Sequence, residues 1–260
     1  MADQEPFETI EFAVSDHVAT ITLNRPAAMN AFNQTMLDEF PIVWKRCRTD
    51  DDIRAVVLRA NGDRAFSTGV DVIEGRDRHE NPWSDDDPGV YLGAKQNRVW
   101  KPLICALHGM VAGGAFYWVN EADVVICSEE ATFFDPHTTY GKTAALEPIG
   151  LLRRIPFGDV ARMALFGNDE RMSSTRALQI GLVTEVVTRE ALWDRAAVLA
   201  RRLTEKPPIA VQGTVRALWD AQDMSGGGGR SIPMIYTKVS NPLSEEPFSK
   251  PTEKRRYEIR

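Results

Sequence analysis

Hydrophobic and polar residues alternate near the N-terminus and then take up helical spacing. Residues 9–14 (TIEFAV) and 18–23 (VATITL) alternate, contain several β-branched residues and are separated by SDH, which predicts a hairpin. The next segment has apolar residues at helical spacing, with Asn33 as its expected N-cap and Pro41 as the point of an expected kink or break. The apolar run at residues 53–60 (IRAVVLRA) then predicts a buried strand.

A strand, a glycine-rich exit and a helix follow one another again in PLICALHGMVAGGAFYWVNEAD, residues 102–123. DVVICS and ATFF come next as short predicted strands. From about residue 158 the spacing is mostly helical, and LVTEVV interrupts it as one strand. Recurring strand-then-helix units predict an α/β fold with a core of β segments and helices packed outside it.

Composition and charge exclude several classes of protein. A chain of 260 residues with 43% hydrophobic content is long enough to bury one large core. Its formal charge of -6 argues against a nucleic-acid surface, which needs clustered Lys and Arg. The three cysteines, Cys47, Cys105 and Cys127, are odd in number and widely spaced, so we expect neither a disulfide framework nor a metal site. This cysteine pattern predicts that the protein is located in a reducing cytoplasm. We also expect neither export nor membrane insertion, because no signal-peptide pattern and no long apolar window is present.

Two glycine-containing segments, each at the exit from a predicted strand, carry candidate functional backbone groups: RAFSTGVDV at residues 64–72 and HGMVAGGAF at residues 108–116. Each can present free N–H groups, and a converging pair of N–H groups is what an oxyanion hole requires. The first exit can equally be a plain strand-to-helix turn, in which Asp71 caps the helix. The second lacks the glycine spacing and the downstream acid of a dinucleotide fingerprint, so a nicotinamide oxidoreductase is the weakest hypothesis.

Taken in this order and at this separation, these motifs resemble the enoyl-CoA hydratase/isomerase (crotonase) superfamily over about residues 8–222. The matching segments are LNRPAAMNAF, FSTGVDV, LICALHGMVAGGAF, ADVVICSEEATFFDP, ALFGNDERMSSTRALQIGLVTEVV and EKPPIAV. The resemblance implies a crotonase-like spiral of ββα units at residues 1–200, which holds the acyl-CoA site. It also implies a C-terminal helical trimerisation region and tail at residues 201–260, and a homotrimer or a dimer of trimers.

The resemblance also implies the thioester site. The N–H groups of Val70 and Gly114 would hold the thioester oxygen and stabilise an enolate. The positions that match coenzyme A contacts are Ala27, Ala28, Met29, Ser67, Thr68, Gly69, Asp71 and Gly113. The acyl-CoA substrate would carry coenzyme A itself, with no other cofactor, no metal ion, and no nucleic acid or membrane as partner.

The chain departs from the hydratase pattern at the two glutamates that handle water. Their positions fall on Tyr117 and His137. His137 is suited to general acid/base catalysis because the ordinary pKa of histidine is about 6.5. Glu147 is its expected orienting acceptor, an arrangement similar to that of carbon–carbon bond hydrolases of this superfamily, which act on β-dicarbonyl compounds.

Each of these side chains also has a structural interpretation. His137 can be a loop histidine that is hydrogen-bonded to a backbone carbonyl. Glu147 can be an acid in the first turn of a helix, where the helix dipole stabilises its charge. Tyr117 can be a member of the aromatic cluster at residues 116–118. We therefore expect an acyl-CoA enzyme that performs hydration, isomerisation or hydrolytic C–C cleavage. The alternative is a catalytically silent homologue that binds acyl-CoA. The loop at residues 74–89 matches the segment that shapes the acyl pocket and does not identify the acyl group.

Overall fold

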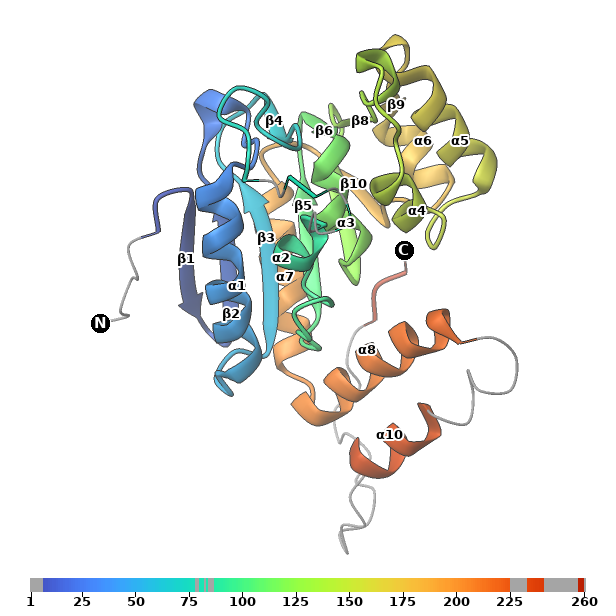
Figure 1. Cartoon of the computed structure of the whole chain (residues 1–260). Coiled ribbons are helices and arrows are strands. Elements are labelled where there is room, and N and C mark those ends of the chain that lie inside the picture. The colour runs from blue at the N-terminus through green and yellow to red at the C-terminus, as the bar shows by residue number, and fades with distance from the viewer. Residues whose placement is uncertain are drawn as a thin grey trace, which may run out of the picture.

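Two β-sheets form the centre of the molecule. The computed structural model describes residues 7–77, 80–81, 83, 87–224, 233–240 and 257–259. The larger sheet has the strand order β1-β2-β3-β5-β7-β10 and the smaller the order β4-β6-β8-β9 (Figure 1). The strands are β1 (Ile10–Ser15), β2 (Val18–Leu23), β3 (Ala55–Ala60), β4 (Ala65–Ser67), β5 (Leu103–Leu107), β6 (Met110–Ala112), β7 (Val124–Ser128), β8 (Thr132–Phe134), β9 (Met172–Ser173) and β10 (Glu185–Val187).

Helices cover the faces of these sheets and form the C-terminal part of the described chain. The α-helices are α1 (Gln34–Thr49), α2 (Gly89–Leu92), α3 (Phe116–Asn120), α4 (Leu146–Leu151), α5 (Phe157–Phe166), α6 (Ser174–Gln179), α7 (Leu192–Thr204), α8 (Pro208–Asp223) and α10 (Pro233–Ser240). Short 3₁₀ helices are η1 (Pro26–Ala28), η3 (Gly113–Ala115), η4 (Thr138–Tyr140) and η5 (Gly167–Asp169). The described residues contain no helix long and apolar enough to cross a membrane.

The chain alternates between the two sheets in a repeating order. The predicted hairpin is confirmed, since β1 and β2 pair antiparallel from Ile10↔Leu23 to Ser15↔Val18. After it, β3, β5 and β7 add to the large sheet in parallel, and each is followed directly by a short strand of the small sheet: β4, β6 and β8. Helical segments close the turns of this path. The predicted crotonase-like spiral of ββα units is therefore confirmed.

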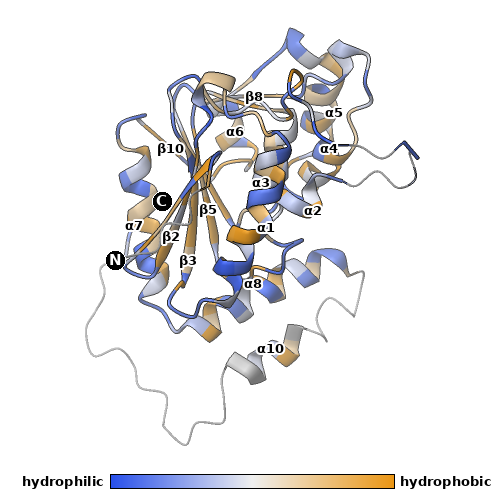
Figure 2. Ribbon diagram, turned by 60° about the vertical axis from the view of Figure 1, so that its left-hand side comes forward, coloured by the Kyte–Doolittle hydropathy of each residue, from blue (hydrophilic) through white to orange (hydrophobic). Residues whose placement is uncertain are grey.

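The core lies on both faces of the large sheet. Helix α1 packs on one face, where Met36, Phe40 and Trp44 are fully buried, and α7 packs on the other, where Ala196 and Ala200 are buried. The central strands are coloured mainly as hydrophobic residues (Figure 2). Such runs are typical of parallel strands that are covered on both faces.

Helix α1 begins where the sequence predicts and continues through its proline. The side chain of Asn33 accepts a hydrogen bond from the N–H of Met36 at 3.1 Å, which confirms the expected N-cap. The expected break at Pro41 is wrong, because α1 runs unbroken from Gln34 to Thr49. Buried packing on both sides of the proline offsets the loss of one helical hydrogen bond.

Polar contacts connect the C-terminal helical region to the core, among them those of Asp123. Asp123 accepts a hydrogen bond from the indole N–H of Trp219 on α8 at 2.6 Å, and its other oxygen pairs with the Lys95 ammonium at 2.8 Å. Near the end of the chain, Glu258 accepts hydrogen bonds from Arg195 and Arg202 of α7. The glycine run at residues 225–229, which the sequence predicts to be flexible, and most of the polar tail, which it predicts to fold over a neighbour or fray, lie outside the described residues.

The buried histidine His108 predicts an acid sensitivity of folding. Burial is the main cause that lowers the pKa of His108 to about 4, and the charge of Arg189 acts in the same direction. The unfolded chain therefore takes up a proton near pH 6.5 while the folded chain does not, so stability is lost as the pH falls from about 6.5 towards 4. This group accounts for about 3 kcal/mol of that loss.

Urea unfolding at pH 7 and pH 4.5 tests this expectation with the His108→Leu variant. The variant should lose less of its unfolding free energy between the two pH values than the wild type loses, because leucine has no proton to gain. An equal loss in both proteins would show that His108 does not cause the acid sensitivity.

Candidate active site

The first glycine-containing exit turns the N–H of Val70 away from its neighbouring strand. The N–H of Phe32 donates to the carbonyl of Gly69 at 2.8 Å, and the N–H of Asp71 donates to the carbonyl of Phe32 at 2.8 Å. These two bonds form a parallel bridge between Phe32 and Val70. In such a bridge the atoms on either side of Val70 make the bonds, so its own N–H points away from Phe32.

The second exit brings the N–H of Gly114 beside this turn. Gly114 is the second residue of η3, where an N–H has no acceptor within the helix. Gly69 has φ +87°, and a Cβ built on it would lie 2.6 Å from the nitrogen of Gly114. The two backbones are therefore in direct contact, and no larger residue fits at Gly69. The structure brings the two predicted exits together.

Both exits open into one cavity of about 1210 Å³. The predicted residues that line it are Met29, Thr68, Val70, Gly113, Gly114, Tyr117, His137 and Glu147. Loop residues Asp87 and Pro88 line the same cavity. Backbone donors, an acid/base cluster and a loop wall therefore surround a single space.

The ring of His137 is held by Asp135, which the sequence analysis did not consider. The Nδ1 atom of His137 lies 2.5 Å from Oδ1 of Asp135, and the same oxygen accepts the backbone N–H of His137 at 3.0 Å. Asp135 is 1% exposed. Glu147 is not the orienting acceptor that the sequence predicted, because its Oε1 lies 3.8 Å from Nε2, on the other side of the ring. The Asp-Pro-His spacing is the feature that could have indicated Asp135.

The protonation of His137 and Glu147 follows from these contacts. The hydrogen bond to Asp135 is the main cause that raises the pKa of His137; burial acts in the opposite direction, and the charges of Asp135 and Glu147 raise it further. Burial raises the pKa of Glu147. The Asp135 contact thus favours the protonated form of His137, burial favours the neutral form of Glu147, and the two groups face each other across 3.8 Å.

Tyr117 occupies the wall between Glu147 and Asp87. Its side chain is 9% exposed and contacts Phe32 edge to face, with ring centroids 6.3 Å apart. Burial, then the charges of Glu147 and Asp87, raise the pKa of Tyr117, so its hydroxyl keeps its proton. The aromatic ring is part of the core, as one interpretation predicted, while the hydroxyl lies near two carboxylates that can accept from it. Glu121, one helical turn after Tyr117, points to a different part of the chain: its carboxylate accepts the N–H groups of Lys95 and Gln96 at 2.5 and 3.1 Å.

One atom from each of Asp135, His137 and Glu147 lies within 4.8 Å of the others, a grouping that a divalent cation could bridge. The contacts favour a different use. Oδ1 of Asp135 already accepts from two groups of His137, so binding of a metal ion by that oxygen would compete with both hydrogen bonds. The cluster therefore fits a carboxylate–imidazole acid/base system better than a metal centre.

The remaining positions predicted for coenzyme A contacts lie in the same region but not on the cavity wall. Ala27 and Ala28 belong to η1, where Ala27 is exposed. Ser67 is fully buried, and its hydroxyl accepts the N–H of Gly69 at 3.2 Å. Asp71 accepts the N–H groups of Ile73 and Glu74 and so caps the following turn, where one interpretation had predicted the cap of a helix.

The family model for enoyl-CoA hydratase/isomerase matches residues 13–228. The chain belongs to the enoyl-CoA hydratase/isomerase family. The resemblance inferred from its motifs is thereby confirmed, as is the processing of acyl-CoA at the level of this family.

Relatives in the enoyl-CoA hydratase/isomerase family include two that add or remove water. The chain is 34% identical to (E)-benzylidenesuccinyl-CoA hydratase of Thauera aromatica over 83% of this chain and 84% of that protein. It is 31% identical to carnitinyl-CoA dehydratase of Citrobacter koseri over 78% of this chain and 77% of that protein. The crystal structure of an enoyl-CoA hydratase/isomerase from Mycobacterium paratuberculosis matches with a TM-score of 0.83 and 34% identity, covering 90% of this chain and 91% of that chain.

Proposed function

We propose that this protein catalyses the reversible addition of water to an enoyl-CoA thioester. The observation that carries the proposal is the pairing of His137 with Glu147, 3.8 Å apart, in the cavity that the N–H groups of Val70 and Gly114 adjoin. These N–H groups would donate hydrogen bonds to the thioester oxygen and so stabilise its negative charge when an enolate forms. Removing one such donor typically slows a reaction by about 10²–10³-fold. The similarity to a hydratase and a dehydratase supports the same reaction.

The acid/base pair supplies the two proton transfers of hydration. Glu147, as carboxylate, takes a proton from water while the water oxygen bonds to Cβ of the enoyl group. The electrons of the double bond move to the thioester oxygen, held by Val70 and Gly114. Protonated His137 then donates to Cα, the thioester carbonyl re-forms, and the proton held by Glu147 returns to His137 across the 3.8 Å gap. Dehydration is the reverse sequence.

Asp135 and Tyr117 would act through this pair. Asp135 fixes the tautomer and orientation of His137 by accepting from Nδ1, which leaves Nε2 towards Glu147. Tyr117 presents its hydroxyl to Glu147 and so would fix the carboxylate on the side of the reacting carbons. One imidazole and one carboxylate would thus take the place of the two glutamates of the family pattern.

The Asp135–His137 contact also favours a second candidate reaction, the hydrolytic C–C cleavage of a β-dicarbonyl thioester. A neutral His137 oriented by a buried carboxylate could remove a proton from water that attacks the carbonyl carbon. The enolate leaving group would again be held by Val70 and Gly114. In this reaction His137 must start neutral, whereas in hydration it starts protonated.

Product analysis by mass spectrometry tests the proposal. The protein is incubated with crotonyl-CoA and, in the same mixture, the coenzyme A thioester of a cyclic β-diketone. Hydration predicts that crotonyl-CoA gains the mass of one water, and C–C hydrolysis predicts that only the diketone gains water and opens. Binding of both thioesters without any mass change would contradict both reactions and favour the silent acyl-CoA-binding homologue.

The assembly of the protein is a further part of the proposal. Large apolar side chains are exposed on the helical region, among them Ile149, Phe157, Leu165, Ile209 and Leu218. Faces of this kind are typical of surfaces that are covered by another subunit. A homotrimer, or a dimer of trimers, would cover them, and light scattering at low protein concentration measures that state.

Replacement of Asp135 should change the pH dependence in a direction that separates the two reactions. In hydration His137 acts as an acid, so activity falls as the pH rises through its raised pKa. The Asp135→Asn variant loses the main cause of that rise, so the fall should occur at lower pH, with a kcat about tenfold smaller at the optimum. Profiles of kcat and of kcat/KM against pH measure both effects. Activity that instead rises with pH through this pKa would contradict the role of His137 as an acid in hydration.

A further inference from the structure

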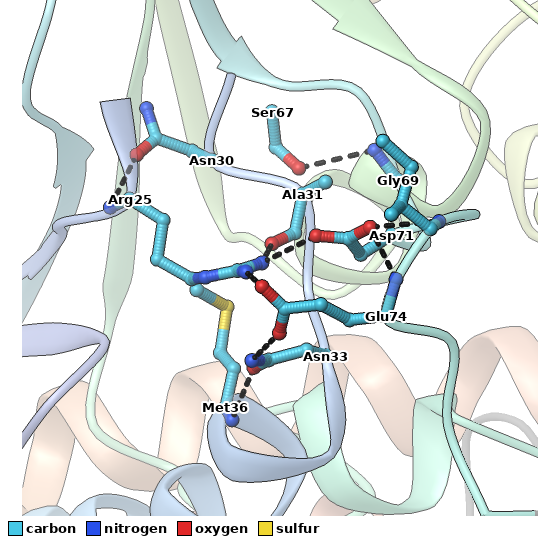
Figure 3. A network of polar contacts seen from close by, with 10 residues as sticks. Arg25, Asn30, Ala31, Asn33, Met36, Ser67, Gly69, Asp71 and Glu74 are labelled. Atoms are coloured by element: carbon cyan, nitrogen blue, oxygen red, sulfur yellow. Dashed lines mark hydrogen bonds and ion pairs between the residues drawn. The ribbon is translucent and has the colours of Figure 1, made fainter. Parts of the chain in front are cut away.

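A network of charged side chains surrounds the turn that carries the N–H of Val70 (Figure 3). Arg25 lies at its centre: its Nη1 contacts Oδ2 of Asp71 at 3.0 Å and the carbonyl of Ala31, and its Nη2 contacts Oε1 of Glu74 at 2.5 Å. The Arg25 side chain is 12% exposed. None of the proton transfers proposed above uses these residues.

Asp71 ties this network to the turn. Its Oδ1 accepts the N–H groups of Ile73 at 2.9 Å and Glu74 at 3.0 Å, while Oδ2 faces Arg25. Burial raises the pKa of Asp71, but these hydrogen bonds and the Arg25 guanidinium together lower it below its ordinary value. The carboxylate is therefore ionised at neutral pH, and all of its contacts are made at once.

Arg25 braces both sides of the bridge that orients Val70. Ala31, whose carbonyl Arg25 binds, directly precedes Phe32, and Asp71, whose carboxylate Arg25 binds, directly follows Val70. Phe32 and Val70 are the two members of the parallel bridge. A rotation of the peptide between Gly69 and Val70 would break the hydrogen bond that the Gly69 carbonyl accepts from Phe32. Arg25 keeps this bond in place because it holds Ala31 beside Phe32 and Asp71 beside Val70.

A second arm of the network reaches the start of α1. Glu74 uses its other oxygen to accept from the side-chain amide of Asn33 at 2.6 Å. Asn33 in turn caps α1 through the N–H of Met36. The turn is thus fastened to a long, buried helix rather than to a mobile loop.

The charges of the network show how it can act. Arg25 carries one positive charge, and Asp71 and Glu74 carry one negative charge each. The sum is negative, so its field would oppose the negative charge that develops on the thioester oxygen. Any benefit to catalysis must therefore come from the geometry that the network imposes on the N–H of Val70.

We propose that Arg25 is a positioning residue for the oxyanion hole, which fixes the direction of the Val70 N–H through Asp71 and Ala31. The proposal rests on the proposed function of Val70 and Gly114. It places a functional residue on the segment that precedes η1, outside the cavity wall.

The experiment compares the full-length wild type with Arg25→Gln and Arg25→Lys. The first readout is the steady-state turnover of crotonyl-CoA, and the second is the ultraviolet absorbance of enolate when acetoacetyl-CoA binds. We expect Arg25→Gln to lower kcat by about 10- to 100-fold and to change KM by less than about threefold. It should also reduce the enolate absorbance, and Arg25→Lys should restore part of both. Arg162→Gln, which breaks the exposed pair with Glu170, is the control that should keep wild-type values.

The outcomes separate this proposal from the proposed function. If the wild type forms enolate but does not hydrate crotonyl-CoA, and Arg25→Gln loses the enolate, the positioning role stands and hydration is wrong. If both Arg25 variants keep wild-type enolate absorbance and kcat, the positioning role is wrong and the proposed function is unaffected. Where Arg25→Gln does not fold, Asp71→Asn tests the same brace, because it keeps the oxygen that caps the turn and removes the charge that Arg25 binds. A wild type that binds acetoacetyl-CoA without enolate would overturn both proposals.

Discussion

We expect His137→Gln to lower the kcat for hydration of crotonyl-CoA by about 10²–10⁴-fold. Glutamine keeps most of the volume of the ring but cannot donate and recover a proton near neutral pH. The Asp135 carboxylate remains in place and the oxyanion turns are untouched, so the KM should change little. Steady-state kinetics of the purified variant measure both constants.

A second histidine provides a matched control for this variant. His17 lies in the exposed turn between β1 and β2, where its Nδ1 contacts the carbonyl of Asp52 at 2.9 Å. His17→Asn should therefore keep the wild-type kcat. A His137→Gln protein that retains wild-type turnover would show that Glu147 and Tyr117 suffice, and would remove His137 from the mechanism.

We expect Gly69→Ala to lower the kcat for hydration about as strongly as the histidine variant does. The added methyl group would lie 2.6 Å from the nitrogen of Gly114 and 3.1 Å from the carbonyl oxygen of Ala112, both of them backbone atoms. The Gly114 N–H would have to move away from the Val70 N–H. Loss of one oxyanion donor lowers kcat by about 10²–10³-fold.

The backbone conformation of Gly69 adds a separate effect, which Gly181→Ala isolates. Gly69 has φ +87° and Gly181 has φ +82°, but a Cβ on Gly181 would meet nothing within 4 Å. Both variants should lose about 1 kcal/mol of stability from the left-handed backbone. Only Gly69→Ala should also lose activity and the enolate absorbance of bound acetoacetyl-CoA. Equal activities in the two variants would contradict the close approach of the two turns.

Much of the fold could be predicted because its signals are local. The alternation in β1 and β2 and the cap at Asn33 are properties of neighbouring residues, and the structure confirms both. The break expected at Pro41 does not occur, because the packing of Phe40 and Trp44 on the sheet outweighs the intrinsic preference against proline in a helix. The expected alternation of strands and helices is found because each unit of the spiral repeats the same pattern, whereas the short strands β6 and β9 were not predicted.

The candidate site was predictable where the backbone defines it and less so where side chains do. The glycines of the two exits and the position of His137 can be read from the motifs, and the structure places them around one cavity. The acceptor for His137 was assigned to Glu147 because a carboxylate ten residues away is as plausible in sequence as one two residues away. Only the folded turn shows that Asp135 reaches Nδ1 and Glu147 faces Nε2. Arg25 and Asp71 are separated by 46 residues, so no local pattern reveals their contact.

Three consecutive strands of the small sheet end at the same cavity: Val70 follows β4, Gly114 follows β6, and His137 follows β8. The first two contribute main-chain atoms, which every residue type possesses, whereas the third contributes a side chain. Changes of side chain between related proteins are therefore tolerated differently at these three positions. Under the proposed function, mutation could exchange the proton-transfer group after β8 while the N–H groups that would bind the enolate remain. The architecture would then allow a lineage to keep one high-energy intermediate while it changes the fate of that intermediate.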